Sequence, residues 1–383
     1  MGADRRDLRV LMTTDTVGGV WQFTIEMARQ LARRGDRVLL AAMGREPDAA
    51  QRQQVASIPG VALRARPYKL VWMDDPWRDL EASAHWLRGL ATAFMPDVVH
   101  LNDLAHADLA WPAPVVVTAH SCVCSWWQAV HRVPAPAGWT RYRSCVADCL
   151  HAADMVVTPT AAMRDALVQQ HGVIASPRVI HNGRSPGAQP DLAKEPFVLG
   201  AGRLWDEAKN LGALSLVAAR LPWTVYLAGD TRHPDGGDID PGPTHALGLL
   251  PDAQLRRWMA RAAIYALPAR YEPFGLSVLE AAQCGCALVL GDIPSLREVW
   301  GEDALFVPPD DHDALADALH GLIEDGALRA SMARRARRRA RRYSADAMAS
   351  RYRDVYLDLI ARRRPIPQSS GWRRSQATAG ARA

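Results

Sequence analysis

Two glutamates bracket a turn in the segment YEPFGLSVLE, which spans residues 271–280. The turn leads from a predicted strand over 264–267 into a helix that contains Glu280, and Gly275 allows close approach to the backbone where this helix begins. The first amides of such a helix attract an anion, and diphosphate would suit this position. Glu272 on the loop and Glu280 in the helix would then bind hydroxyl groups at the two ends of a nucleotide sugar. A loop anion and a paired helix residue explain the same spacing without a ligand.

Two cations precede the glutamates by one α/β repeat. The segment GAGRLWDEAKN, residues 200–210, follows a predicted strand and places Arg203 and Lys209 six residues apart. Cations at a strand end that faces a diphosphate would neutralise its charge and support a departing nucleoside diphosphate. Taken alone, such a pair is more often two solvated surface charges.

The N-terminal half carries candidates at two strand ends. Gly18 and Gly19 lie in a predicted strand-to-helix turn, TTDTVGGVWQF, which lacks the G-x-G-x-x-G fingerprint of dinucleotide sites. A nicotinamide site is therefore poorly supported, and a tight turn is the simple explanation of the glycine pair. His120 follows the predicted strand over 115–118, a position where a histidine usually serves as a hydrogen-bonding residue.

Three residues are candidates for the acceptor side. Trp126 and Trp127 follow His120 closely, and aromatic faces can stack on sugars, although core packing is the default for a tryptophan. Asp103 closes the segment HLND, residues 100–103, where turn and cap chemistry explains it equally well.

Two patterns could bind metal, and the sequence favours neither. Asp238 and Asp240 form a D-x-D pattern, but they lie in a loop rich in glycine and proline, where a solvated turn is the better interpretation. Four cysteines form C-x-C and C-x3-C pairs whose spacings depart from the usual zinc knuckles, so zinc remains open: Cys122, Cys124, Cys145 and Cys149. Cys284 and Cys286 are expected to be small core residues.

The elements that must position these residues alternate between strands and helices. Apolar runs predict strands over 8–12, 37–41, 97–101 and 115–118, with a helix over 20–34. After the turn-rich segment 182–187 the pattern restarts, with predicted strands over 197–200, 223–228, 264–267 and 287–290. Two doubly wound α/β halves in series would place ligands in a cleft between them, at the carboxyl ends of their strands.

Length and charge limit the class of protein. With 383 residues the chain exceeds what one core usually supports, and it has neither an apolar run long enough to span a membrane nor a signal peptide pattern. We therefore expect a cytoplasmic protein with reduced thiols. Residues 329–383 hold 16 Arg against 3 Asp, whereas the whole chain carries only +5. The densest run, around residues 334–342, is expected to be a solvated helix face, with an anionic membrane surface as the alternative and nucleic acid as a less favoured one.

The motifs together resemble glycosyltransferase family 4. EPFGLSVLEA carries its E-x7-E motif, Arg203 and Lys209 match its phosphate clamp, and IHNG, residues 180–183, resembles its hinge. The resemblance covers nearly the whole chain. It implies an α/β protein of GT-B architecture, in which two Rossmann-like domains face each other across a cleft and a C-terminal helix closes back towards the N-terminal domain.

The resemblance also implies roles for the candidate residues. Glu280 would bind the donor ribose, Glu272 and His120 the transferred sugar, and Arg203 and Lys209 the diphosphate. Further donor contacts would come from Gly18, Gly19, Leu249, Phe274, Gly275, Leu276 and Ser277. The implied reaction is retaining transfer from a nucleoside diphosphate sugar, with UDP or GDP as the favoured nucleotide, and it requires neither a metal nor another cofactor.

Domain boundaries follow from the same pattern. We expect an N-terminal acceptor-side domain over 1–183, a linker over 184–194 and a donor domain over 195–343. A helix over 344–364 should bury one face, and residues 365–383 have the composition of a disordered tail. The buried face of that helix would carry Met348, Tyr352, Val355, Tyr356 and Leu359.

Other functions fit parts of these patterns. A non-hydrolysing sugar-nucleotide epimerase also uses two Rossmann-like domains and needs no acceptor. A non-catalytic protein that binds a nucleotide sugar would never turn it over. Within the transferase interpretation, the acceptor could be a sugar, a lipid-linked glycan or a small molecule, and polysaccharide or glycolipid assembly is the expected context.

Overall fold

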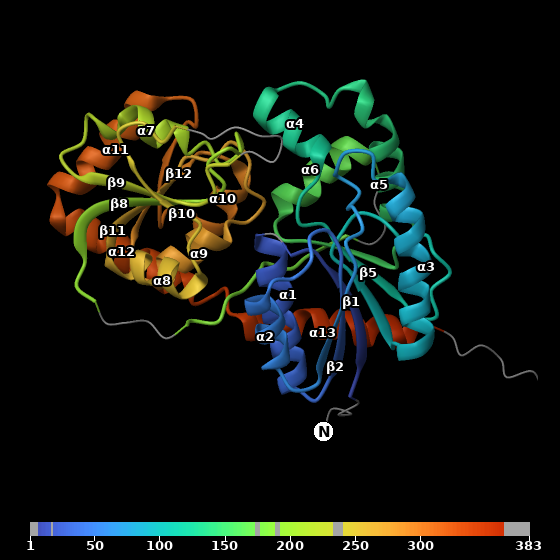
Figure 1. The fold of residues 1–383 in the computed structure, drawn as a ribbon. Coiled ribbons are helices and arrows are strands. Elements are labelled where there is room, and N and C mark those ends of the chain that lie inside the picture. The colour runs from blue at the N-terminus through green and yellow to red at the C-terminus, as the bar shows by residue number, and fades with distance from the viewer. Residues whose placement is uncertain (1–6, 17, 173–176, 188–191, 233–239, 364–383) are drawn as a thin grey trace, which may run out of the picture.

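The N-terminal domain is built on a parallel sheet. The computed structural model describes residues 7–16, 18–172, 177–187, 192–232 and 240–363. Within them the first sheet has the order β3-β2-β1-β4-β5-β6-β7 (Figure 1). Its inner strands are short, largely buried apolar runs, as is typical of a parallel sheet between helices, whereas the edge strands β3 and β7 are partly exposed. The strands are β1 (Arg9–Thr14), β2 (Arg37–Ala42), β3 (Val61–Ala65), β4 (Val98–Leu101), β5 (Val115–Thr118), β6 (Met155–Thr158) and β7 (Arg178–Val179).

Helices connect these strands, and α2 and α6 begin at side-chain caps. The side chain of Asp48 accepts a hydrogen bond from the amide of Gln51 at the start of α2, and Thr160 accepts one from Met163 at the start of α6. Both caps satisfy amides that would otherwise lack a partner. The helices are α1 (Gly19–Arg33), α2 (Ala49–Ala56), α3 (Trp77–Phe94), α4 (Val123–His131), α5 (Thr140–Ala152) and α6 (Ala161–His171).

The second domain repeats the architecture with its own core. Its parallel sheet has the order β10-β9-β8-β11-β12-β13. The strands are β8 (Glu195–Ala201), β9 (Thr224–Ala228), β10 (His245–Gly248), β11 (Ala262–Leu267), β12 (Ala287–Gly291) and β13 (Leu305–Val307). The helices are α7 (Gly212–Ala218), α8 (Asp252–Arg261), α9 (Leu276–Gln283), α10 (Pro294–Trp300), α11 (His312–Glu324) and α12 (Gly326–Ala340).

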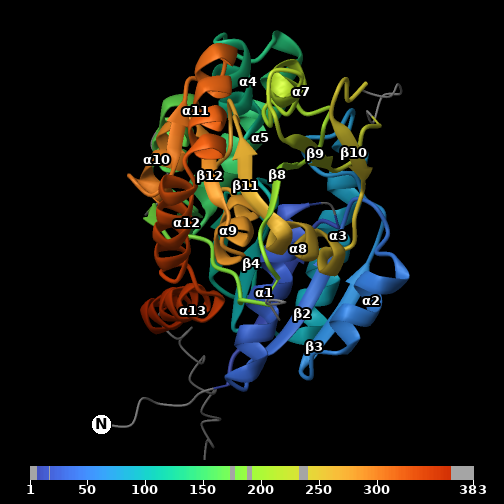
Figure 2. The same ribbon diagram turned by 90° about the vertical axis from the view of Figure 1, so that its left-hand side faces the viewer.

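The last helix, α13 (Ala345–Arg362), returns to the first domain, as Figures 1 and 2 show. Tyr352 and Tyr356 are fully buried in the core that also contains Phe23 of α1. The hydroxyl of Tyr356 lies 2.7 Å from Nδ1 of His100 on β4. The two-domain architecture and the closing helix expected from the sequence are therefore confirmed. The expected tail, 365–383, lies outside the described residues.

The arginine-rich run forms part of α12, and its members have different surroundings. Arg335 and Arg339 contact Asp303 within the second domain, and Arg339 also donates to the carbonyl oxygen of Val299. Five others are exposed: Arg334, Arg337, Arg338, Arg341 and Arg342. Part of the run therefore stabilises the domain, and part faces outward. Among the described helices, none is long and apolar enough to cross a membrane.

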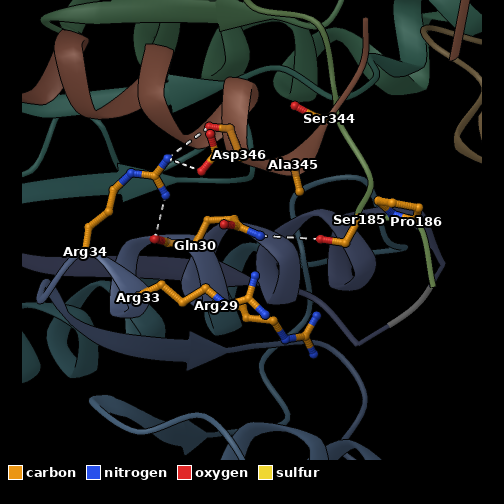
Figure 3. A pocket seen from close by; sticks show the side chains of 9 residues that line it. All are labelled: Arg29, Gln30, Arg33, Arg34, Ser185, Pro186, Ser344, Ala345 and Asp346. Atoms are coloured by element: carbon orange, nitrogen blue, oxygen red, sulfur yellow. Dashed lines mark hydrogen bonds and ion pairs between the residues drawn. The ribbon is translucent and has the colours of Figure 1, made fainter. Parts of the chain in front are cut away.

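A hollow of about 760 Å³ lies at the domain junction, between α1, the segment after β7 and the start of α13 (Figure 3). Arg29 and Arg33 of α1 and Arg34, which follows it, line the hollow together with Ser185 and Ser344. Two of these arginines already have acidic partners, since Arg29 pairs with Glu26 and Arg34 with Asp346. None of the residues predicted to bind the donor lines this hollow.

Candidate active site

The loop between β11 and α9 is folded tightly around Glu272. The amide of Gly275 donates to Oε1 of Glu272 over 3.0 Å. Gly275 has a φ of 89° and caps α9, and an added Cβ would lie only 3.1 Å from Val278 and 3.2 Å from Leu296. A side chain at position 275 would therefore strain the backbone and crowd its neighbours. Glycine is therefore the residue that this turn requires.

The two predicted cations lie at the end of β8, next to this loop. Nζ of Lys209 donates to Oε2 of Glu272, so these two predicted site residues are direct partners. Arg203 contacts Asp206 at 2.5 Å and lies over the ring of Trp205. Burial opposes ionisation of Asp206, but Arg203 and then Lys209 outweigh it and hold the pKa of this carboxyl below its usual value.

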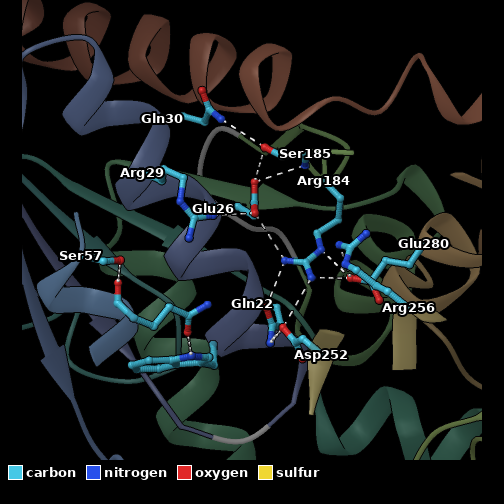
Figure 4. A network of polar contacts seen from close by, with 12 residues as sticks. Gln22, Glu26, Arg29, Gln30, Ser57, Arg184, Ser185, Asp252, Arg256 and Glu280 are labelled. Atoms are coloured by element: carbon cyan, nitrogen blue, oxygen red, sulfur yellow. Dashed lines mark hydrogen bonds and ion pairs between the residues drawn. The ribbon is translucent and has the colours of Figure 1, made fainter. Parts of the chain in front are cut away.

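Glu280 is held by two arginines. The guanidinium of Arg184 contacts its Oε1 at 2.5 Å, and Arg256 reaches the same oxygen at 3.5 Å (Figure 4). Arg184 comes from the segment after β7, whereas Arg256 comes from α8. The two contacts fix the orientation of the Glu280 carboxylate, which suits a group that accepts hydrogen bonds from ribose hydroxyls.

Arg184 also joins the two domains. Its Nη1 donates to Oε1 of Gln22 over 3.0 Å and lies 3.6 Å from Glu26, and both of these residues belong to α1 (Figure 4). The side chain is 5% exposed. Burial alone would lower its pKa, but Glu280 and Glu26 raise it above the ordinary arginine value, so the charge is retained. The sequence analysis missed Arg184, because an arginine in a turn-rich segment looks solvated.

His120 lies at the carboxyl end of the first sheet. Its Nε2 lies 2.9 Å from Oδ1 of Asn102, and the Nδ2 group of Asn102 donates to the carbonyl oxygen of Thr13. Because the amide oxygen must accept, Nε2 of His120 carries the proton. Burial lowers the pKa of His120 to about 3, so the ring is neutral at physiological pH.

The glycine turn of the first domain faces α9 of the second. Gly18 caps α1 with a φ of 68°, and a Cβ added there would meet nothing within 4 Å. A Cβ added to Gly19 would lie 3.5 Å from Cδ1 of Leu276. The turn after β1 therefore lies close to the start of α9, which follows β11. The space beside Gly18 is open.

The other predicted donor residues differ in what they can offer. Phe274 is buried with its ring against His181 and Tyr343, so only its backbone is available to a ligand. The hydroxyl of Ser277 accepts a hydrogen bond from Tyr265. Leu249, which follows β10, is 77% exposed.

The three candidates for the acceptor side have different surroundings in the structure. Nε1 of Trp126 lies 3.4 Å from Oδ1 of Asp206, so this ring reaches the clamp loop of the other domain. Trp127 stacks at a tilt on His131 and packs edge-on against Trp126. Asp103 accepts a hydrogen bond from the amide of Ala105, as the turn interpretation expects.

The candidate metal patterns are only partly assembled. Asp238 lies outside the described residues, and the exposed Asp240 accepts from the amide of Gly242. The four cysteines do not form one site: Cys122 and Cys124 lie beside His171, whereas Cys145 and Cys149 lie apart on α5. Within the described part of the chain, this Cys-Cys-His group is the one cluster able to hold a metal. Cys286 is buried and Cys284 half-buried, and all six cysteines are free thiols.

Comparisons with known proteins match both domains. A model named Glycosyltransferase Family 4 matches residues 17–186, and one named Glycosyl transferases group 1 matches residues 195–325. A D-inositol 3-phosphate glycosyltransferase of Xylanimonas cellulosilytica is 28% identical over 91% of this chain and 94% of its own length.

Solved structures give the same architecture at low sequence identity. A sucrose-phosphate synthase from Thermosynechococcus elongatus has a TM-score of 0.76 at 18% identity, covering 93% of this chain and all of that one. Anabaena HepE, solved in complex with UDP and glucose, has a TM-score of 0.72 at 18% identity, covering 92% of this chain and all of that one. These similarities confirm the GT-B fold that the sequence predicted.

Proposed function

This chain belongs to glycosyltransferase family 4, and we propose that it moves a sugar from a nucleoside diphosphate sugar to an acceptor hydroxyl with retention of anomeric configuration. That it is a glycosyltransferase follows from the family. The nucleotide-sugar donor and the stereochemistry are the proposal. The contact between Lys209 and Glu272, which follow the neighbouring strands β8 and β11 of the second sheet, is the observation that carries it.

In the proposed reaction, each residue at this site has a specific role. A diphosphate at the start of α9 would lie beside Arg203 and Lys209, which would stabilise the charge that develops as the sugar leaves. When Lys209 turns to the phosphate, Glu272 becomes free to accept hydrogen bonds from the transferred sugar. Glu280, fixed by Arg184, would bind the ribose at the other end of α9.

The N-terminal domain would supply the acceptor side of the reaction. The Nε2 proton of His120 is bonded to Asn102, and the neutral ring can contact the transferred sugar without adding positive charge near the anomeric carbon. In a front-side route the departing phosphate oxygen takes the acceptor proton, so the residues of this chain need only position the reactants. Trp126 lies beside the loop that carries Arg203 and Lys209, and it would form one wall of the acceptor site.

UDP is the first nucleotide to test, because the similar Anabaena protein was solved with UDP and glucose. Nucleotide release from UDP-glucose, UDP-galactose and GDP-mannose would be measured with an acceptor panel that includes inositol phosphates and lipid-linked sugars. We expect one donor to release nucleotide only when acceptor is present, and NMR of the product to show retained configuration. Epimerised donor without acceptor, or bound donor that is never consumed, would contradict the proposal.

Exposed arginines in α12 and directly after it support a related proposal on location. We propose that Arg334, Arg338, Arg341 and Arg342 attract an anionic membrane surface, as a glycolipid acceptor would require. Co-sedimentation with vesicles containing phosphatidylglycerol should exceed that with pure phosphatidylcholine and fall when the four are changed to glutamine. Equal sedimentation with both vesicles would contradict it.

A further inference from the structure

We propose that Cys122, Cys124 and His171 bind a zinc ion that joins the start of α4 to the end of α6. Their three candidate ligand atoms all lie within 4.8 Å of one another. This would be a structural site beside the transfer centre, since none of its ligands is among the residues assigned to the donor or the transferred sugar.

The spacing of the ligand atoms fits a tetrahedral ion. Sγ of Cys122 lies 3.2 Å from Nε2 of His171. With Zn–S and Zn–N bonds of about 2.3 and about 2.0 Å, ligand atoms around tetrahedral zinc lie roughly 3.5–3.8 Å apart. The observed arrangement therefore needs shifts of only tenths of an ångström at this pair. A water molecule can complete the fourth position, as in other sites with three protein ligands.

The fold fixes each ligand on a regular element. Cys122 caps α4, Cys124 lies in its first turn and His171 is the last residue of α6. The amide of Cys122 is further held by the hydroxyl of Tyr271 at 3.2 Å. Thiolates at a helix start are favoured by the positive end of the helix dipole. Two thiolates and one neutral imidazole would balance the charge of Zn²⁺.

The histidine ring is directed into this cluster. Among the polar contacts of the described residues, Nδ1 of His171 is buried and has no partner, so the polar contact of the ring is made through Nε2, towards Cys122. Cys122 and Cys124 are themselves almost completely buried. Soft thiolates with an imidazole select zinc over magnesium or calcium.

The ion would hold the helix that carries the acceptor-side residues. α4 begins directly after His120 and bears Trp126, whose ring reaches Asp206 of the other domain. α6 meets the second domain at its start, where Thr160 donates to the carbonyl oxygen of Pro273. Linking α4 to α6 would therefore fix the wall of the site on which Trp126 lies.

Metal analysis of the purified full chain tests the proposal. We expect about one zinc per chain and, after removal of the metal under reducing conditions, uptake of Co²⁺ with thiolate charge-transfer and tetrahedral visible bands. Cys122→Ser, Cys124→Ser and His171→Gln should each lose these bands. Cys145→Ser, a thiol on the neighbouring α5, is the matched control and should keep them.

A second measurement needs no variant. Added Zn²⁺ should raise the melting temperature of the metal-free wild-type protein, because it binds the folded state. Failure to take up Zn²⁺ or Co²⁺, a Cys122–Cys124 disulfide in its place, or equal loss of metal in Cys145→Ser would overturn the site.

Discussion

The guanidinium of Arg184 contacts Oε1 of Glu280 at 2.5 Å and is buried between the two domains. The same side chain approaches Glu26 of α1 in the opposite domain. The carboxylate proposed to bind the donor ribose is thus oriented by a residue that also bridges the domains. Donor binding and the relative placement of the domains should therefore be coupled through Arg184.

Arg184→Met should destabilise the protein by about 3–5 kcal/mol, because it leaves Glu26 and Glu280 buried without their shared cation. Urea unfolding would measure the free energy of unfolding. Arg261→Met is the control, since Arg261 pairs with Glu195 where both are exposed, and it should cost less than about 1 kcal/mol. If both substitutions lower the free energy of unfolding equally, the buried network around Arg184 stabilises the protein no more than the surface pair does.

Lys209→Met and Arg203→Met should each lower kcat by about 10²–10³ if they stabilise the departing diphosphate. The donor identified by the nucleotide-release assay would be the substrate. Arg220→Met removes a surface cation that pairs with Asp313 and should leave kcat nearly unchanged. Near-normal turnover in both clamp variants would refute the assignment of the clamp.

Stability should fall on acidification because the buried His100 and the half-buried His120 stay neutral in the folded protein. Burial lowers the pKa of both His100 and His120 to about 3, while an unfolded histidine titrates near about 6.5. Between these values the unfolded chain binds more protons, so the free energy of unfolding decreases as pH falls through this window. His100→Asn removes one such group and should flatten the decrease between about pH 6.5 and about pH 5. Urea unfolding at several pH values checks this, and an unchanged slope would argue against a buried neutral His100.

Docking of α13 should depend on its tyrosines. Tyr352 is fully buried and its hydroxyl lies 3.1 Å from that of Thr118, so Tyr352→Ala should cost about 3–5 kcal/mol through the cavity it leaves. The exposed neighbour Arg351→Ala should stay within about 0.5 kcal/mol of the wild type. Thermal and urea unfolding would measure both, and similar stability of the two variants would mean that α13 is not part of the first core.

The sequence predicted those features that arise from local patterns. Apolar runs located β1, β2, β5 and β12, and the spacing of apolar residues in α13 identified its buried face, which includes Tyr352. The sequence analysis did not identify β3, β6, β10 and β13. β13 has only three residues, and β3 is a partly exposed strand at the sheet edge. Short apolar runs of this kind cannot be assigned from periodicity alone.

Features that depend on distant contacts could not be predicted. Arg184 lies 96 residues from Glu280, and its burial exists only because two domains enclose it. His171 joins Cys122 from the end of another helix, 49 residues away, whereas spacing had grouped Cys122 with Cys145 and Cys149. The roles of Glu272 and Glu280 came from the family motif, because spacing alone leaves open whether such acids are paired structural residues.

Calorimetric titration of UDP, GDP and ADP into the wild-type protein and Glu280→Gln, without added metal, tests the donor site most directly. We expect one nucleotide to bind, and the substitution to weaken it at least tenfold, or about 1.4 kcal/mol, through loss of the ribose contact. The control Glu302→Gln changes an exposed acid and should bind as the wild type does. Binding that is absent in the wild type, or unaltered in Glu280→Gln, would contradict the account.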